Sequence, residues 1–353
     1  MPESLPLTAE GVTPAWLSAA LGIRFPGVVI TAAEPVQVIE GTATKVRLQL
    51  SYNPHTPREG LPDQLCVKGG FGDYREYLGG MGLYSGEVRF FNEIAPLYEL
   101  ACPTSYFGVA QTDPVQGIIA MEDLKARGVT FAQATRPLSV ELASAGLDEL
   151  AALHGQSWQD DRPRRLGVEP LLSDSTEPIV QDFFAALPER FAAPRGFAAP
   201  VVLHDPDRLR AAYTAYRAAA HRGAVCVVHG DAHIGNAYVE PDGRVGFVDW
   251  QTVAVGPWVH DVNYFVVSAL DVPDRRAHER DLLGHYLKAL AAFGVSVPGP
   301  DEAWDDYRRA TVHGFLGWLC NLDQWQPAEV NTATYARFGM AMIDHDTYDA
   351  LSV

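Results

Sequence analysis

Polar and apolar residues alternate over short stretches of the first 124 positions, and turns containing glycine or proline separate these stretches. Alternation with a period of two is typical of β-strands that have one buried face. The pattern predicts three antiparallel strands and then two more, which together complete a five-stranded sheet. The five expected strands are Val28–Ile39 (interrupted at Pro35), Lys45–Tyr52, Leu65–Val67, Tyr106–Ala110 and Gly117–Met121.

Two helices are expected beside these strands. Residues 8–21 have helical spacing, with Thr8 as the expected cap, and residues 85–100 follow the third strand, with a kink or stop at Pro96. Glu87 falls at the centre of the apolar face of the second helix. A buried carboxylate needs a partner, and Lys68 at the end of the third strand is the best candidate. Alternatively, Glu87 lies in a frayed first turn and favours the helix dipole. The helix pattern alone supports both interpretations equally.

Helical spacing dominates after residue 124. A short polar connection, residues 125–128, separates the expected sheet from this region, and such a connection marks a domain boundary. We therefore expect an α+β fold with two domains, residues 1–124 and 125–353. The main expected helices are Leu142–Trp158, Ile179–Phe191, Pro206–His221, Val259–Leu270, Arg276–Phe293, Trp304–Leu322 and Val330–His345.

Residues 227–251 interrupt the helical pattern with short apolar runs around the turn Pro241-Asp242-Gly243, which predicts paired strands. Asp231 and Asn236 follow one run, and Asp249 ends another. The pairing should bring these two carboxylates and the amide together near one edge. Such a set can hold a hard divalent cation and orient an attacking hydroxyl group.

Composition narrows the possible partners and the compartment. The formal net charge of −17 disfavours binding to nucleic acid or to an anionic membrane. The four cysteines form no CxxC pair, which favours a reducing compartment and argues against a zinc-thiolate site. No run approaches the roughly 20 apolar residues of a membrane span, and the N-terminus lacks the features of a signal peptide. We expect a cytoplasmic protein. The sequence does not indicate its oligomeric state.

The polar residues suit phosphoryl transfer, because that reaction depends mainly on positioning and on charge neutralisation. Lys68, held by Glu87, could neutralise phosphate oxygens. Asp231 could accept or orient a hydroxyl proton, while Asn236 and Asp249 bind magnesium.

The segment HGDAHIGN (residues 229–236), followed by VDWQ (residues 248–251), resembles the catalytic and metal-binding motifs of the aminoglycoside phosphotransferase-like kinases. It is most similar to the ecdysteroid-kinase-like and general phosphotransferase branches of that superfamily. The resemblance implies a protein-kinase-like fold, with a β-rich N-lobe, a helical C-lobe, and ATP between them. It also implies Mg²⁺ as cofactor. The DFG and APE signatures of protein kinases are absent, which indicates a small-molecule hydroxyl acceptor.

The resemblance implies a role for individual residues of the second domain. Asp231 matches the catalytic aspartate, and Asn236 and Asp249 match the magnesium ligands. His229 matches a histidine that supports the loop. Asp261 matches an aspartate that steadies the same loop, although it could equally be an ordinary residue at a helix start.

In the first domain, the resemblance implies that Lys68 contacts the α- and β-phosphates and that Glu87 is its helix partner. Glu122, Asp123 and Leu124 match the hinge that contacts adenine. A G-x-G-x-x-G loop is missing, and the shorter segment with Gly41 and Thr42 is expected to donate backbone N–H groups to phosphate.

Two other functions remain open. The spacing His229-x-Asp231-x-His233 could supply ligands for a metal-dependent hydrolase, and a catalytically silent protein could bind nucleotide without turnover. His233 and Gln251 have no assigned role, although Gln251 could support Asp249.

The sequence does not identify the acceptor. An acidic surface suits an aminoglycoside, whereas C-terminal aromatic residues suit a steroid, terpenoid or macrolide, which we favour. The aromatic set, with one histidine, is Trp304, Tyr307, His313, Phe315, Trp318 and Trp325.

Overall fold

The computed structural model describes residues 4–174, 177–220 and 222–353, so the expected helix end at His221 lies outside the described residues. The chain divides into two compact units. The first unit comprises the residues up to Leu97 together with Cys102–Val129 and Trp250–Thr252. The second unit comprises Tyr98–Ala101, Thr130–Asp249 and Val253–Val353.

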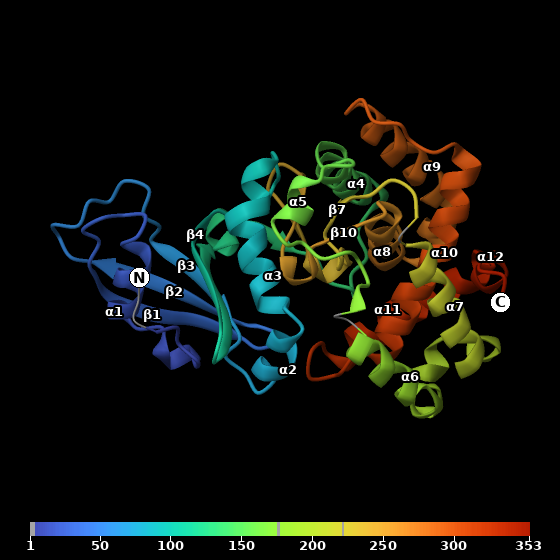
Figure 1. Cartoon of the computed structure of the whole chain (residues 1–353), viewed down its shortest axis with the longest axis horizontal. Helices are drawn as coiled ribbons and strands as arrows, with labels where there is room; N and C mark the ends of the chain where they lie inside the picture. The colour runs from blue at the N-terminus through green and yellow to red at the C-terminus, as the bar shows by residue number, and fades with distance from the viewer. Residues whose placement is uncertain (1–3, 175–176, 221) are drawn as a thin grey trace. The chain divides into compact units, whose positions relative to one another are not determined.

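The first unit is built on an antiparallel five-stranded sheet, which confirms the predicted number of strands (Figure 1). The strand order is β1-β2-β3-β5-β4. β1 contains a register shift between Pro35 and Gln37, because proline has no N–H group to donate to the neighbouring strand. The strands are β1 (Ile30–Ile39), β2 (Thr44–Tyr52), β3 (Gln64–Gly69), β4 (Ser105–Thr112) and β5 (Val115–Glu122).

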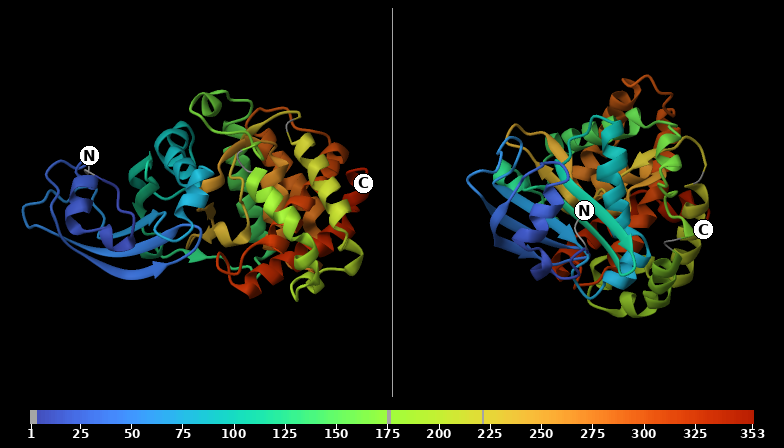
Figure 2. Two further views of the ribbon diagram at one scale, coloured as in Figure 1. Left: turned by 60° about the horizontal axis from the view of Figure 1, so that its bottom comes forward. Right: turned by 60° about the vertical axis from the view of Figure 1, so that its left-hand side comes forward.

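Side chains on the two faces of this sheet have different surroundings. Leu65 and Val67 of β3 belong to a buried apolar core that includes residues of helix α1 (Pro14–Leu21), which packs against the sheet (Figure 2). Successive side chains of a strand point to opposite faces. Lys68 therefore points away from this core, toward the face that carries helix α3.

The predicted cap of the first helix was wrong. Thr13 caps α1, since its hydroxyl oxygen accepts the backbone N–H of Trp16 at 3.2 Å. Thr8 precedes a separate 3₁₀ turn, Ala9–Gly11, and makes no capping hydrogen bond there. Pro14 at the first helical position explains the later start, because a helix tolerates proline there and not in its interior.

The expected helix at residues 85–100 is less regular than predicted, and it ends at Leu97, beside the stop expected at Pro96. It begins earlier, as α3 (Leu83–Arg89), after the short helix α2 (Arg75–Gly80). It then continues as a π turn, Phe90–Ile94, and a 3₁₀ turn, Ala95–Leu97. Pro96 lacks the N–H group that a further α-helical turn would need, which accounts for the early end.

The second unit is mostly helical, and its expected helices are confirmed with shifted ends. Helix α8 is at its centre, because every one of its residues is buried and α4, α10 and α11 pack against it. The helices are α4 (Val140–Gln156), α5 (Arg162–Arg165), α6 (Glu177–Ala192), α7 (Pro206–Ala219), α8 (Val259–Ala269), α9 (Val272–Ala291), α10 (Pro300–Cys320), α11 (Ala328–Asp344) and α12 (Thr347–Ala350).

Short strands in the second unit support the loops around residues 229–236 and 249. β8 (Ala237–Val239) and β9 (Val245–Phe247) form the expected hairpin, and β6 (Thr130–Phe131) pairs with β8. β7 (Cys226–Val228) pairs with β10 (Ala254–Gly256) and not with the hairpin. Within the described ranges, no helix combines the length and the apolar character needed to cross a membrane.

Candidate active site

The loop of residues 229–236, which follows β7, is anchored by one buried carboxylate. Asp261 lies in the first turn of α8, and its side chain accepts the backbone N–H groups of His229 at 2.6 Å and Gly230 at 2.9 Å. Gly230 has φ +81°, a left-handed conformation that favours glycine. Asp261 therefore does more than begin a helix, because it fixes the backbone immediately before Asp231.

Two further side chains hold Asp261. His154 of α4 lies 3.2 Å from the Asp261 carboxylate through Nε2, and its Nδ1 lies 2.8 Å from the hydroxyl group of Tyr286. Burial acts to raise the pKa of Asp261, but the hydrogen bond with His154 and the nearby histidines outweigh it, so the pKa is lowered. Asp261 is therefore a carboxylate at neutral pH, able to accept both N–H groups.

Asp231 and Asn236 are joined directly. The Asn236 amide group donates to the Asp231 backbone carbonyl at 2.9 Å and to its carboxylate at 3.1 Å. The Asn236 carbonyl oxygen is then the atom of this side chain that can face a cation. Asp231 keeps a 37 % exposed side chain, whereas Asn236 is buried. The loop therefore presents one partly accessible carboxylate, held in place by its neighbour.

Asp249 contributes a second carboxylate beside Asp231. It follows β9 and has φ +72°, in the left-handed region. The pKa of Asp231 is raised well above its usual value, first by the limited solvation of its carboxyl group and then by the charge of Asp249. Two carboxylates that repel each other, together with an amide oxygen, fit Mg²⁺, which prefers oxygen ligands and completes its shell with water and phosphates.

Both ring nitrogens of His229 and Nδ1 of His233 form hydrogen bonds within the protein, and Nε2 of His233 lies 3.6 Å from the Asp231 carboxylate. His229 Nε2 donates to the Val248 carbonyl at 3.0 Å, and its Nδ1 accepts the backbone N–H of Asp231 at 3.2 Å. His233 Nδ1 accepts the N–H of Gly235 at 2.9 Å, and burial lowers the pKa of His233 to about 3. Across the described residues, no group of three or more His, Cys, Asp or Glu side chains is arranged to hold a metal. The hydrolase interpretation therefore has no ligand cluster to support it.

Two residues near Asp231 were not singled out in the sequence. Tyr264 of α8 is close enough to Asp231 that, after burial, the Asp231 charge contributes to raising the pKa of its hydroxyl group. His260 Nε2 contacts the Gly230 carbonyl at 3.1 Å, and its Nδ1 lies 2.8 Å from the Tyr216 hydroxyl. Their position on α8, directly after the hairpin, was the only sequence signal. Because most of that helix is apolar, they resembled ordinary core positions.

The C-terminal aromatic residues serve mainly as core. Tyr307 and Phe315 are fully buried, and Phe315 stacks on Tyr335 at 5.0 Å between ring centroids. Trp318 is also buried, at 3 % exposure, and its ring meets His233 edge-on at 4.9 Å. All three of these α10 residues are buried, so the predicted aromatic acceptor wall has little accessible surface.

In the first unit, Lys68 and Glu87 form the expected buried pair. The ammonium nitrogen of Lys68 lies 2.7 Å from one Glu87 oxygen and 2.9 Å from the other, and both residues are 3 % exposed. The backbone N–H of Trp250 also donates to Glu87, at 3.2 Å. Glu87 is therefore inside the helix packing and not in a frayed turn. Gly86 permits this approach, because a Cβ there would lie 2.9 Å from the Gln251 carbonyl oxygen.

The expected phosphate loop connects β1 and β2. Gly41 has open space around it apart from an ordinary contact with the Ala43 carbonyl. The Thr42 hydroxyl donates to the Gln251 side chain at 3.1 Å, and the Tyr84 hydroxyl donates to the Thr42 carbonyl at 2.8 Å. Gln251 thus supports this loop, a contact that the sequence did not indicate.

The expected hinge residues have side chains that are already engaged. Asp123 accepts two hydrogen bonds from the Arg47 guanidinium, at 2.9 and 3.1 Å, and Glu122 pairs with Arg127 at 3.0 Å. Leu124 is buried. Some of their backbone groups are used as well, since the Glu122 N–H donates to the Thr104 carbonyl at 2.8 Å and the Asp123 carbonyl accepts the Ala126 N–H at 2.9 Å.

The expected site residues fall into two groups. Asp231, Asn236 and Asp249 lie in the second unit, where Asn236 is hydrogen-bonded to Asp231 and the charge of Asp249 acts on Asp231. Lys68, Glu87, Thr42 and the hinge residues lie in the first unit, and the peptide bond between Asp249 and Trp250 connects the two units.

Comparison with known proteins identifies the family. Residues 44–295 match the family model described as the ecdysteroid kinase-like family. The chain belongs to this family. A comparison with curated proteins found no match. Membership of the ecdysteroid kinase-like family supports a phosphotransferase activity on a small molecule.

Solved structures show that this ecdysteroid kinase-like chain has a protein-kinase-like α+β fold. It is similar to an ethanolamine kinase from Plasmodium vivax, with a TM-score of 0.52 and 12% identity over 88% of this chain and 81% of that one. It is similar to a macrolide 2'-phosphotransferase type I, with a TM-score of 0.51 and 15% identity over 90% and 96% of the two chains. It is also similar to APH(2")-IIia in its GDP and kanamycin complex, with a TM-score of 0.51 and 11% identity over 95% and 98%.

Proposed function

We propose that this protein is an ATP- and Mg²⁺-dependent kinase that phosphorylates a hydroxyl group of a small molecule. The observation that carries the proposal is the pair of Asp231 and Asn236, in which a partly accessible carboxylate is oriented by an amide, within the electrostatic reach of the Asp249 carboxylate. APH(2")-IIia was solved with GDP, so a nucleotide occupies a protein of this fold. Residues 1–124 would bind the nucleotide and residues 125–353 the acceptor.

Asp231 orients the acceptor hydroxyl and accepts its proton as the oxygen attacks the terminal phosphate. A pKa above the usual range makes Asp231 a better proton acceptor, provided that it is ionised when the acceptor binds. Asn236 keeps the carboxylate pointed in one direction. Asp261 sets the backbone before Asp231 through the N–H groups of His229 and Gly230.

Asn236 and Asp249 would hold magnesium, which when bound neutralises charge on the phosphate oxygens. Lys68 is oriented by Glu87 and would contact the α- and β-phosphates. Gly41 and Thr42 would contact phosphate through their backbone, and residues 122–124 would contact adenine through theirs. Because Lys68 is buried, its ammonium group stays in one orientation and loses little further freedom when phosphate binds.

The proposed acceptor is an uncharged or lipophilic alcohol of the steroid, terpenoid or macrolide type. Near the 229–236 loop, the rings of Tyr264 and Trp318 both contact His233, at 5.9 and 4.9 Å between centroids. His233 remains neutral because burial lowers its pKa to about 3. These three rings are uncharged and largely buried, and the charged groups nearest to them are the carboxylates of Asp231 and Asp249. We place the enzyme in the cytoplasm, where its four free cysteines would stay reduced.

Phosphorylation of hydroxylated metabolites tests the proposal. A library of steroids, terpenoids, macrolides and aminoglycosides would be screened for acceptor-dependent formation of ADP in the presence of Mg²⁺. Asp231→Asn should lower transfer by roughly 10²-fold or more while nucleotide still binds. Transfer at the wild-type rate by this variant would contradict the assignment of Asp231. Binding of ATP with no turnover on any acceptor class would favour the catalytically silent alternative.

A further inference from the structure

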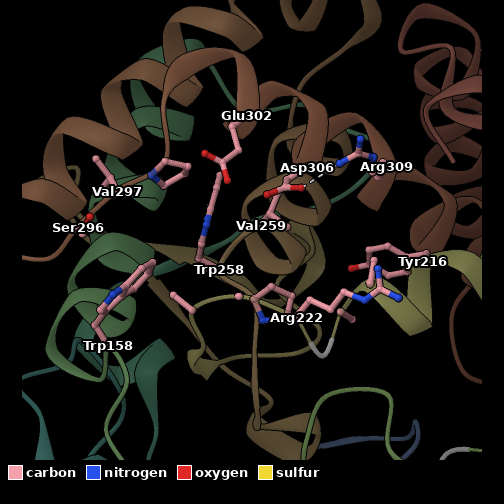
Figure 3. Close-up of a pocket in the computed structure, with 16 residues that line it drawn as sticks. Trp158, Tyr216, Arg222, Trp258, Val259, Ser296, Val297, Glu302, Asp306 and Arg309 are labelled. Carbon is pink, nitrogen blue, oxygen red and sulfur yellow. Dashed lines mark hydrogen bonds and ion pairs between the residues drawn. The ribbon is translucent and has the colours of Figure 1, made fainter.

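A cavity of about 340 Å³ lies within the second unit, apart from the 229–236 loop (Figure 3). It is partly open to solvent and is lined by the segment after α4, the end of α7, the segment before β7, the start of α8, the connection after α9 and the first half of α10. None of the residues that line it belongs to the 229–236 loop, and Asp249 is not among them. The cavity is therefore a separate place where a small molecule could bind.

Two tryptophans form walls of this cavity. Trp258 stacks on Tyr286 with 5.1 Å between ring centroids and 21° between planes. Because Tyr286 covers one face of Trp258, the opposite side of this indole is the one that can line the cavity. Trp158 lies across from it in Figure 3, and Val297 completes this part of the wall. The face of an indole ring attracts a cation more strongly than that of any other side chain.

Carboxylates border the same space. Glu302 and Asp306 are one turn apart on α10 and therefore lie on one side of the helix. Asp306 pairs with Arg309 at 3.2 Å, and burial raises the pKa of Asp306. Glu302 forms no ion pair or hydrogen bond in the part of the chain that the structure describes, and it lies above Trp258 in Figure 3. It is the carboxylate that is free to pair with a ligand.

Among the described residues that line the cavity, the two arginines are either paired or directed away from the tryptophans. Arg309 is engaged by Asp306 and by the Ala350 carbonyl, which its Nε contacts at 2.9 Å. The Arg222 guanidinium points toward Tyr216 in Figure 3, away from Trp158. The part of the cavity beside the two tryptophans is thus aromatic and acidic.

We propose that this cavity binds a small organic cation, with its ammonium group between Trp158 and Trp258 and its charge paired with Glu302. The site is independent of the proposed phosphoryl transfer, since it shares no residue with the 229–236 loop. An anion would face Glu302 and Asp306 there. A neutral apolar molecule would gain no attraction from the Glu302 carboxylate, which is exposed to water.

Two chains of contacts connect the cavity to Gly230, the residue before Asp231. The Tyr216 hydroxyl, on one wall, contacts His260, and His260 contacts the Gly230 carbonyl. Trp258, on another wall, stacks on Tyr286. Tyr286 then leads through His154 and Asp261 to the Gly230 N–H, as described above. A ligand that orders these walls should therefore slow exchange of the amide hydrogens in residues 226–236.

Calorimetric titration of the full chain without nucleotide tests the site. The probe is tetramethylammonium, which has no hydroxyl group to be phosphorylated, and the neutral comparison is tert-butanol. Tetramethylammonium should bind at least roughly fivefold more tightly than tert-butanol. Glu302→Gln should weaken its binding by roughly fivefold, whereas Asp301→Asn, on the adjacent exposed residue of the same helical turn, should leave it unchanged. Trp158→Leu should weaken the binding of tetramethylammonium more than Glu302→Gln does.

Two further measurements test whether tetramethylammonium binds in this cavity. Tetramethylammonium should protect residues 226–236 from hydrogen exchange in the wild type and not in Glu302→Gln. Asp249→Asn should bind the cation as the wild type does. No binding, equal binding of tert-butanol, equal loss in Asp301→Asn, or a loss in Asp249→Asn would overturn the proposal. Because no nucleotide or acceptor is present, this result does not depend on whether the protein is a kinase.

Discussion

The Asn236 side-chain amide donates to both the backbone carbonyl and the carboxylate of Asp231, at 2.9 and 3.1 Å. One side chain therefore fixes the loop conformation and the direction of the proposed proton acceptor. The same amide group retains its oxygen for a metal. Because Asn236 would use both its N–H group and its oxygen, we expect even a substitution of the same size at this position to reduce phosphoryl transfer.

Asn236→Asp should reduce phosphoryl transfer by roughly 10²-fold or more, because the new carboxylate cannot donate to Asp231 and repels it. Asn236→Ala removes the donor without adding a charge and should cost less at high Mg²⁺. The measurement is the rate of ADP formation with a responsive acceptor, as a function of Mg²⁺ concentration. A fully active Asn236→Asp variant would show that the amide donor is not needed.

Asp249→Asn should weaken Mg²⁺-dependent ATP binding and leave the fold intact. Asp249 has φ +72°, and asparagine adopts this conformation more readily than other non-glycine residues. Asp249→Ala should lose the same metal ligand and also lower the free energy of unfolding by about 1 kcal/mol, since alanine is strained there. ATP binding by calorimetry with and without Mg²⁺, and urea denaturation, separate the two effects. Unchanged Mg²⁺ dependence in both variants would place the metal elsewhere.

Lys68→Met should lower the free energy of unfolding by roughly 3–5 kcal/mol, because it leaves the buried Glu87 carboxylate without its cation. Combining it with Glu87→Gln should restore most of this stability, since a glutamine can still accept the Trp250 N–H. The double variant should nevertheless bind ATP at least roughly tenfold more weakly than the wild type, because the phosphate-binding cation is gone. Urea denaturation and ATP titration provide the two readouts. Wild-type ATP affinity in the double variant would make the pair purely structural.

Asp261→Asn should lower the free energy of unfolding by roughly 1–3 kcal/mol, since an amide cannot accept both the His229 and Gly230 N–H groups. The pKa of Asp261 is lowered on folding from its ordinary value of 3.8, so its contribution is complete above about pH 4. It is lost as the pH falls through the lowered value. The difference between wild type and variant should therefore be equal at pH 7 and pH 5 and shrink below pH 4. If the difference in the free energy of unfolding between wild type and Asp261→Asn grows below pH 4, the pKa of Asp261 is not lowered by folding.

Periodicity and polar spacing were enough to find much of the fold and of the candidate site. The five strands follow from alternation, and the placement of Glu87 at the centre of a helix face led to its pairing with Lys68. The polar residues that flank β8 and β9 come together because the hairpin is short. In each case, residues near one another in the chain, or on one periodic face, determine the outcome.

Contacts between distant segments gave no such signal. The Tyr216–His260 and Thr42–Gln251 hydrogen bonds join residues 44 and 209 positions apart. Neither pair stands out from ordinary polar residues in the sequence. The helix cap at Thr13 was missed for a different reason, because two candidate residues were present and Pro14 decided between them.

The sequence by itself determined the residue types that phosphoryl transfer would require and their order along the chain, since short-range geometry places Asp231 and Asn236 on one loop. Only the tertiary structure decided which groups remain accessible. In the folded protein, both ring nitrogens of His229 form hydrogen bonds, and the carboxylates of Glu122 and Asp123 form ion pairs. Tyr307 and Phe315 are buried in the core. The tertiary structure also forms the cavity between Trp158 and Trp258, because packing among helices far apart in sequence decides which faces meet.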